Sequence, residues 1–166
     1  MAGPLDDLPV IETNPLWLGY RCVVCGRHHE NDYDGFVCSD CGPDGILDAV
    51  YDYVALRNSG SVIDRDRDGM WKFAPLLPVW PAAGHHAWSL GATPAVEAPR
   101  LAAHLGLRSL VLKDDTSLPS ASLKDRASAV AVARARQLGI DHLSCASTGN
   151  AAASLAVLAA RAGMSC

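Results

Sequence analysis

Residues 142–163 read HLSCASTGNAAASLAVLAARAG, and this stretch decides the fold class. The apolar run at 142–147 predicts a buried strand, and the polar residues at 147–150 predict a loop. From residue 150 the apolar positions follow helical spacing until Gly163, which supplies the stop. A buried strand, a short polar loop and a helix make up half of a repeating strand–helix unit.

The same alternation occurs upstream. SLVLKDD (109–115) predicts a buried strand that leads into a polar loop, and SLKDRASAVAVARARQLG (122–139) predicts a helix closed by Gly139. PRLAAHLGL (99–107) predicts a short helix closed by Gly106. Helices and strands that alternate with short connections imply a parallel sheet flanked by helices, so we expect an α/β fold.

The rest of the chain differs in character and suggests four regions. Residues 1–20 form an irregular lead-in, and residues 21–53 are rich in turns and cysteine. Residues 54–94 mix charged, proline and glycine positions, which predicts a connecting arm with at most short helices. Residues 95–166 form the α/β domain.

Composition excludes several classes of partner. The net charge is −4 and the sequence has no basic run, so we expect no nucleic-acid partner. The acidic, proline-bearing N-terminus does not resemble a secretory signal, and no apolar run reaches membrane-spanning length. We therefore expect a cytoplasmic protein with no membrane partner.

Four cysteines have the spacing of a metal centre. They form two C-x2-C pairs with twelve residues between them, and a glycine that can adopt a left-handed conformation, Gly26 or Gly42, follows each pair. Four thiolates suit Zn²⁺, and a site with no open position is structural. The predicted ligands of this zinc ribbon are Cys22, Cys25, Cys38 and Cys41.

Redox or incidental cysteines are the alternative to the ribbon. We interpret His28 and His29, which lie between the two pairs, as loop residues because four thiolates already fill the zinc shell. Cys145 is expected to be buried in the strand at 142–147.

Lys124 falls where a helix should begin. Ser122 is a plausible N-cap, and Ser122 with Asp125 matches a capping box. The positive end of the helix dipole and the neighbouring Arg126 both disfavour an ammonium at this position. A lysine that loses its proton easily is a Schiff-base nucleophile of the kind that holds pyridoxal phosphate. The alternative is an ordinary surface lysine in a first turn.

The loop at 147–150 is a candidate anion site. Backbone N–H groups at a helix start, with Gly149 allowing close approach, suit a substrate carboxylate, and the Asn150 side chain adds a directed hydrogen bond. The loop and Lys124 should meet at the carboxyl edge of one sheet, where α/β proteins bind ligands. The alternative is an ordinary helix cap formed by Thr148 or Asn150.

These motifs resemble a known family. SLKDRAS is similar to the lysine motif of fold-type II pyridoxal-phosphate enzymes, the tryptophan synthase beta-like group, and ASTGNAAASLAVLAARAG is similar to their asparagine loop. The ribbon, ILDAVYDY, the arm GMWKFAPLLP and GATPAVEAPRL resemble threonine synthases in particular. The resemblance runs from residue 21 to residue 166.

The resemblance implies a pyridoxal-phosphate-dependent carbon–oxygen lyase of threonine biosynthesis that acts on a phosphate ester. Such enzymes convert O-phosphohomoserine and water to L-threonine and phosphate. Lys124 would form the Schiff base with the cofactor and move protons, and Asn150 would bond the cofactor's 3′-oxygen. The substrate, a small amino acid, would be held at its carboxylate by Ser147, Thr148, Gly149 and Ala151.

Departures from the family pattern leave alternatives open. Ala121 and Leu123 replace a glycine and a phenylalanine, which leaves the substrate open and keeps another β-replacing enzyme such as a cysteate synthase in view. The phosphate-binding glycine-rich loop and the partner of the pyridine nitrogen are expected downstream of residue 166. We therefore expect an N-terminal portion of a longer enzyme that is inactive alone. A homodimer, a non-catalytic zinc-ribbon module and a degenerate paralogue also remain open.

Overall fold

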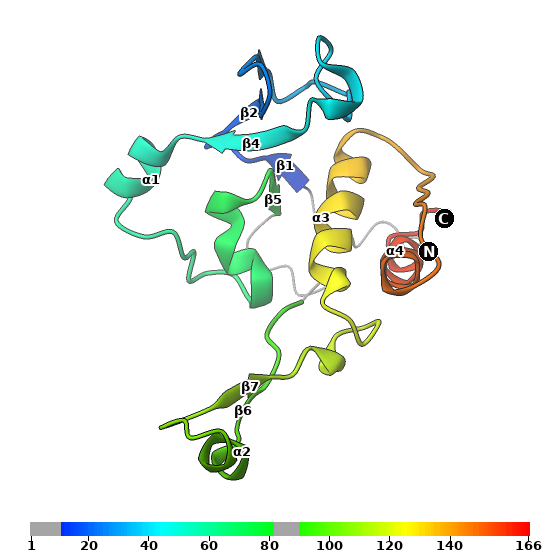
Figure 1. Cartoon of the computed structure of the whole chain (residues 1–166). Coiled ribbons are helices and arrows are strands. Elements are labelled where there is room, and N and C mark those ends of the chain that lie inside the picture. Colours follow the sequence, from blue (N-terminus) through cyan, green and yellow to red (C-terminus); the bar gives the residue numbers. More distant parts are fainter. Residues whose placement is uncertain (1–10, 82–89) are drawn as a thin grey trace.

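The computed structural model describes residues 11–81 and 90–166 (Figure 1). The predicted lead-in and arm therefore lie partly outside the described residues. The strands are β1 (Ile11–Thr13), β2 (Trp17–Cys22), β3 (His28–His29), β4 (Leu47–Tyr51), β5 (Val79–Pro81), β6 (Ala95–Glu97) and β7 (Val111–Lys113). The α-helices are α1 (Tyr53–Asn58), α2 (Pro99–His104), α3 (Lys124–Gln137) and α4 (Asn150–Arg161). Short 3₁₀ helices are η1 (Gly42–Asp44), η2 (Gly69–Leu76) and η3 (Asp115–Ser117).

A small antiparallel sheet carries the cysteine segment. Its strand order is β3-β2-β4, and β2 begins at Trp17, inside the predicted lead-in. Trp17 pairs with Tyr51, and both are buried with Leu56 in a small core of their own. The sheet lies against the C-terminal end of α3 (Figure 1).

The main core lies where α3 and α4 pack together beside η2 and β5. Val132 of α3, Leu158 of α4, Val79 and Leu90 are almost completely buried in it. Small residues on α3, among them Ala129 and Ala133, let the two helices approach closely. Figure 1 shows α3 from the side and α4 nearly end-on, so the two helices cross steeply.

The predicted helices at 99–107, 122–139 and 150–163 are confirmed as α2, α3 and α4. The glycine after each helix, Gly106, Gly139 or Gly163, has a positive φ between 67° and 71°, which is the left-handed stop that the sequence predicts. No helix in the described ranges is long and apolar enough to cross a membrane.

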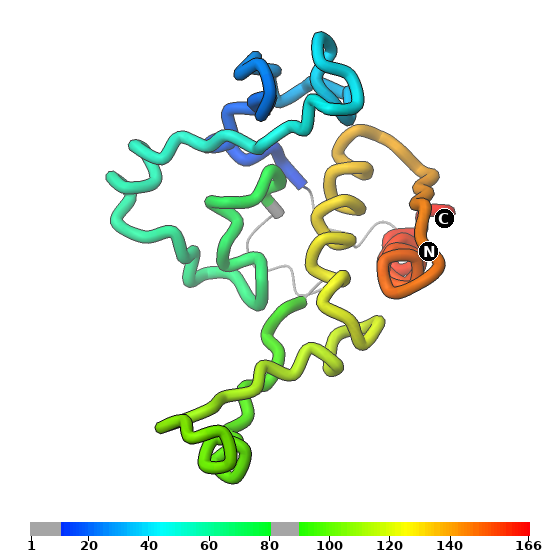
Figure 2. The backbone as a smooth tube through the Cα atoms, viewed as in Figure 1, coloured from blue at the N-terminus to red at the C-terminus, as the bar shows by residue number. Residues whose placement is uncertain are grey.

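The predicted parallel sheet is not confirmed. β7 forms within 109–115, but it pairs antiparallel with β6, and all three of its residues are exposed. The antiparallel pair of β6 and β7 projects from the rest of the chain together with α2, which connects the two strands (Figures 1 and 2), and no layer of the described residues buries β7. The expectation of a buried strand at 109–115 is therefore wrong in this structure.

The predicted buried strand at 142–147 is also absent from the described structure. His142 forms an isolated parallel bridge with Ser165, supported by hydrogen bonds from the Leu143 N–H to the Ser165 carbonyl and from the Ser165 N–H to the Asp141 carbonyl, both 2.9 Å. Cys145 is exposed, contrary to the sequence prediction. Leu143 packs against the main core, but no strand within the described ranges forms a sheet with this segment.

Candidate functional site

Lys124 is the first residue of α3, and its side chain is exposed. The N-cap residue is Leu123, and the Ser122 hydroxyl accepts the Lys124 N–H at 3.3 Å. The predicted capping box between Ser122 and Asp125 does not form, because the Asp125 side chain bonds Ser120 instead. The Asp125 carboxylate accepts the Ser120 N–H at 2.8 Å and the Ser120 hydroxyl at 2.5 Å. The loop reaches this arrangement through Ala121, whose φ is 56°.

Asp125 is completely buried, and its charge is compensated locally. Burial alone would raise the pKa of this carboxyl, but the hydrogen bonds from Ser120 and Ser154 lower it below its ordinary value. The carboxylate also lies in the first turn of α3, where the helix dipole favours a negative charge. Asp125 therefore fixes the loop that leads to Lys124.

α4 begins directly after the polar loop. Its N-cap is Gly149 with no side-chain cap, so the alternative to an anion site, an ordinary cap formed by Thr148 or Asn150, does not occur in the structure. The Ser147 hydroxyl accepts the Gly149 N–H at 3.3 Å and closes the loop locally. Asn150 is exposed at the start of the helix. Because no side chain caps this first turn, its amide groups can receive an anion.

A buried polar contact joins the starts of the two helices. The Ser154 hydroxyl of α4 and the Ser128 hydroxyl of α3 are hydrogen-bonded at 2.8 Å, and the Ser154 side chain also hydrogen-bonds the Asp125 carboxylate. Ser128 lies four residues after Lys124, and Ser154 lies four residues after Asn150. The contact therefore lies one turn inside each helix start. Neither serine is among the site residues predicted from the sequence, although a serine among alanines in a helix signals such a contact.

An open groove of about 680 Å³ runs along this helix pair. Ala127 and Ser128 of α3 and Ala151 and Leu155 of α4 line it, together with the segment that contains Cys145. Ala151 is the predicted substrate-binding residue that lines this groove. Lys124, Asn150 and the other predicted loop residues do not line it.

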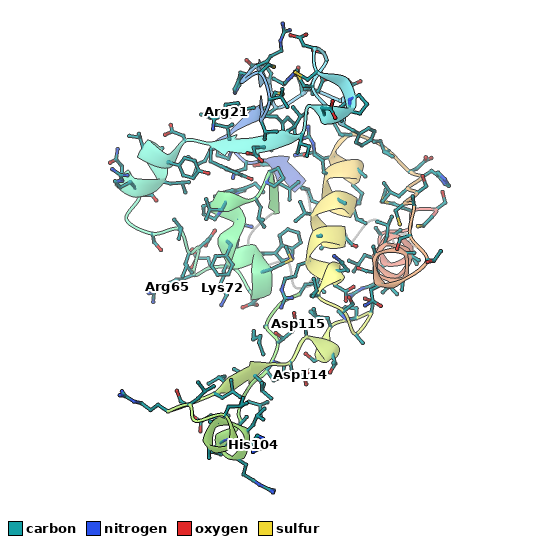
Figure 3. All side chains as sticks on the ribbon, in the orientation of Figure 1. Arg21, Arg65, Lys72, His104, Asp114 and Asp115 are labelled. Atoms are coloured by element: carbon teal, nitrogen blue, oxygen red, sulfur yellow. The ribbon has the colours of Figure 1, made fainter. Side chains whose placement is uncertain are left out.

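A charged cluster joins the β6–β7 pair to the start of α3. Arg126 donates two hydrogen bonds to the Asp115 carboxylate, both 2.7 Å, and the Thr93 hydroxyl donates to the same group at 3.0 Å. These bonds, from Arg126 first, lower the pKa of Asp115 to about 2. Figure 3 labels Asp114 and Asp115 on the segment between β7 and α3. The Arg126 guanidinium is therefore paired with the Asp115 carboxylate.

The four predicted metal ligands come together in the ribbon. Their sulfur atoms all lie within 4.8 Å of one another, and the Cys25 and Cys38 sulfurs are 3.7 Å apart. A tetrahedral Zn²⁺ with sulfur at about 2.3 Å requires sulfur atoms roughly 3.8 Å apart, so the cluster fits that ion. All six cysteines are free thiols.

Crowding makes the cluster electrostatically suited to a cation. Backbone N–H groups, that of Cys25 first, lower the pKa of Cys22 to about 7. A hydrogen bond to Cys25, desolvation and the neighbouring sulfurs raise the pKa of Cys41 to about 12. Four thiolates this close repel one another unless a metal ion compensates their charge.

Glycines shape the ribbon around the cysteines. Gly26 and Gly42 have φ of 75° and 59°, as the sequence predicts. Gly45 was missed: a Cβ there would lie 2.6 Å from the Cys38 Cβ and 2.8 Å from the Cys41 Cβ. The signal for such a close approach is a glycine just after a cysteine pair and before a strand.

Arg134 connects the ribbon to α3. Its guanidinium donates to the Asn31 carbonyl at 2.7 Å and lies 5.2 Å from the centre of the Trp17 ring. Arg134 is ten residues after Lys124, or roughly 15 Å along the helix. The ribbon therefore adjoins the far end of α3 from Lys124, which suits a structural centre.

A family match covers slightly less than half of the chain, at its C-terminal end. Residues 89–166 match the model of the family described as pyridoxal-phosphate dependent enzyme. The chain is 36% identical to threonine synthase of Methanosarcina acetivorans over 144 residues, which are 87% of this chain and 35% of that protein. It is 35% identical to threonine synthase of Methanocaldococcus jannaschii over 148 residues, 88% of this chain and 36% of that protein.

A third relative, threonine synthase of Mycobacterium leprae, is 45% identical over 76 residues, 46% of this chain and 21% of that protein. No solved structure matches the chain. The chain spans about a third of the length of the first two relatives. Residues 89–166 are therefore similar to pyridoxal-phosphate dependent enzymes, and most of the chain is similar to threonine synthases.

Proposed function

We propose that this chain is part of a pyridoxal-phosphate-dependent lyase that converts O-phosphohomoserine and water to L-threonine and phosphate, in the cytoplasm. The observation that carries the proposal is the similarity to threonine synthases over 87% of the chain, and the family match at residues 89–166 includes both helix starts. The polar contact between Ser128 and Ser154 supports it by joining those starts one turn from Lys124 and Asn150.

The residues at the helix starts fit the cofactor and substrate chemically. The exposed amino group of Lys124 would hold the cofactor, and the Asn150 amide would hydrogen-bond the cofactor's 3′-oxygen. Bound pyridoxal phosphate supplies an electron sink for a carbanion. The uncapped first turn of α4 would bind the substrate carboxylate through Ser147, Thr148, Gly149 and Ala151. The Lys124 amine would carry protons to and from substrate carbon.

The ribbon completes the proposal. We propose that Cys22, Cys25, Cys38 and Cys41 hold one structural Zn²⁺, because their sulfur spacing matches tetrahedral coordination. Metal analysis of the purified protein, prepared without chelator, should give one zinc per chain. A value far below one, with the ribbon intact, would remove the zinc from the proposal.

The test uses the whole protein that carries this chain. We expect visible absorbance of bound pyridoxal phosphate and phosphate release from O-phosphohomoserine, and we expect both to be lost in Lys124→Ala. The control is Lys72→Ala, a lysine of η2 in the arm, which should keep both. Cofactor absorbance with no threonine formed would favour another β-replacing reaction. An unchanged Lys124→Ala variant would refute the assignment of the lysine.

A further inference from the structure

His29 lies directly against the cysteine cluster, although the sequence predicts a loop residue there. It forms part of β3, is 8% exposed, and its Nε2 atom lies 3.4 Å from the sulfur of Cys38. Cys38 itself is completely buried. An imidazole nitrogen and a thiol sulfur at this distance form a hydrogen bond.

Neighbouring residues fix His29 in this position. The ring stacks on Tyr33, with ring centres 4.2 Å apart and a tilt of 33°. The Tyr33 hydroxyl donates to the carbonyl of Val37 at 2.8 Å, next to Cys38 in the chain. The backbone is also confined, because Gly19 of β2 lies so close to the His29 carbonyl that a Cβ at residue 19 would be 2.2 Å from it. Tyr33 therefore positions the ring, and the close approach of β2 positions the backbone of His29.

The two halves of the cluster receive different hydrogen-bond donors. The sulfur of Cys22 accepts the backbone N–H groups of Val24 and Cys25, at 3.4 and 3.5 Å. The sulfur of Cys38 has the His29 ring nitrogen within reach. In the second half of the cluster the imidazole thus occupies the role that backbone amides fill in the first half.

We propose that His29 is an outer residue of the metal centre, whose Nε2–H donates to the Cys38 thiolate and holds that ligand in place. The inference rests on the proposed zinc site. A metal-bound thiolate carries no proton and can only accept, so the ring hydrogen must be on Nε2. The four sulfurs already complete a tetrahedral shell, so His29 acts on a ligand and does not bind the ion.

Loss of the donor should weaken metal retention. Changes in residues that hydrogen-bond to metal ligands typically reduce metal affinity by about 10- to 100-fold. The effect should depend on the donor and not on packing alone. The chain provides a matched control in His28, the other residue of β3, which is exposed and lies 3.7 Å from Glu30.

The experiment measures zinc release from the full chain to a chromophoric chelator in excess. His29→Phe keeps a ring against Tyr33 without a donor, and His29→Leu removes the donor in a different shape. His29→Gln restores an N–H at a similar reach. We expect release at least about tenfold faster in the first two variants, near wild-type release in His29→Gln, and no change in His28→Ala.

A second readout separates an outer residue from a ligand. The cobalt-substituted wild type and His29→Gln should share the absorption spectrum of four sulfur ligands. If the spectra of the wild type and His29→Gln differ as expected when one nitrogen ligand is lost, His29 binds the ion directly and the inference is overturned. If a donor-free variant binds no zinc even at saturating metal, the result counts as complete loss of metal retention. Zinc retention in His29→Gln then shows whether the missing hydrogen-bond donor or the missing packing causes that loss.

Release at the wild-type rate in His29→Phe or His29→Leu would overturn the inference while the zinc site stands. Release from His29→Gln as fast as from the two donor-free variants would do the same, because packing would then explain the loss. Equal acceleration in His28→Ala would point to the strand as a whole. A wild-type chain that binds no zinc would overturn both the inference and the zinc proposal.

Discussion

At the scale of single residues, Asp125 determines how the chain enters α3. Its buried carboxylate accepts both the N–H and the hydroxyl of Ser120, and it also hydrogen-bonds Ser154 of α4. We expect Asp125→Ala to reduce the free energy of unfolding by about 2 kcal/mol at neutral pH, because charged hydrogen bonds are lost. Urea denaturation followed by far-UV circular dichroism measures this loss.

The effect of Asp125 should depend on pH. The folded pKa lies below the ordinary value of 3.8, so the stabilisation is fully present above about pH 4 and is lost as the pH falls through the folded pKa. The difference between wild type and Asp125→Ala should therefore shrink as the pH falls below about 4. The exposed Asp141→Ala serves as control, and an equal loss there would contradict the prediction.

At the scale of elements, Arg134 is the contact between the ribbon sheet and α3. Its hydrogen bond to the Asn31 carbonyl and its position over Trp17 are both lost in Arg134→Ala. We expect a loss of roughly 2 kcal/mol from the two interactions together. Tryptophan fluorescence during urea denaturation should show it, whereas Arg100→Ala on α2 should leave the transition unchanged. If Arg134→Ala unfolds at the same urea concentration as the wild type, the contact contributes no stability.

The position of the β6–β7 pair depends on a different interaction, an ion pair with α3. Asp115 and Arg126 connect the end of β7 to α3, and the pKa of Asp115 is lowered to about 2. Its stabilisation is therefore complete above about pH 4 and is lost as the pH falls towards 2. We expect faster hydrogen exchange in β6 and β7 in Asp115→Asn at pH 6, and less difference from wild type near pH 2. Protection that is equal at both pH values would argue against this role.

At the scale of the whole molecule, two separate cores predict two levels of stability. Trp17, Tyr51 and Leu56 pack in the ribbon core, whereas α3 and α4 contribute to the main core. Chelation of the proposed zinc should therefore abolish protection in β2, β3 and β4, because such small modules depend on metal binding energy of about 10–16 kcal/mol.

Hydrogen exchange with and without chelator tests the two levels. α3 and α4 should keep most of their protection after chelation, because their apolar contacts lie in the other core. Uniform loss across both cores would mean that the chain unfolds as one unit. Unchanged protection in β2, β3 and β4 would mean that the ribbon holds without metal.

Local signals in the sequence determined the parts of this protein that local physics controls. The helices end at Gly106, Gly139 and Gly163 because glycine adopts the left-handed conformation without strain. The cysteine pairs meet because each pair lies on a tight turn, so the spacing predicts the cluster.

Tertiary structure alone decided the remaining contacts. The pairing of β7 and the exposure of Cys145 depend on which strands are present to cover them, and a buried strand cannot form without a neighbouring layer. Asp125 bonds Ser120 rather than Ser122 because the loop turns at Ala121. His29 reaches Cys38 through pairing between β2 and β3, a contact between segments that helix and turn signals do not encode.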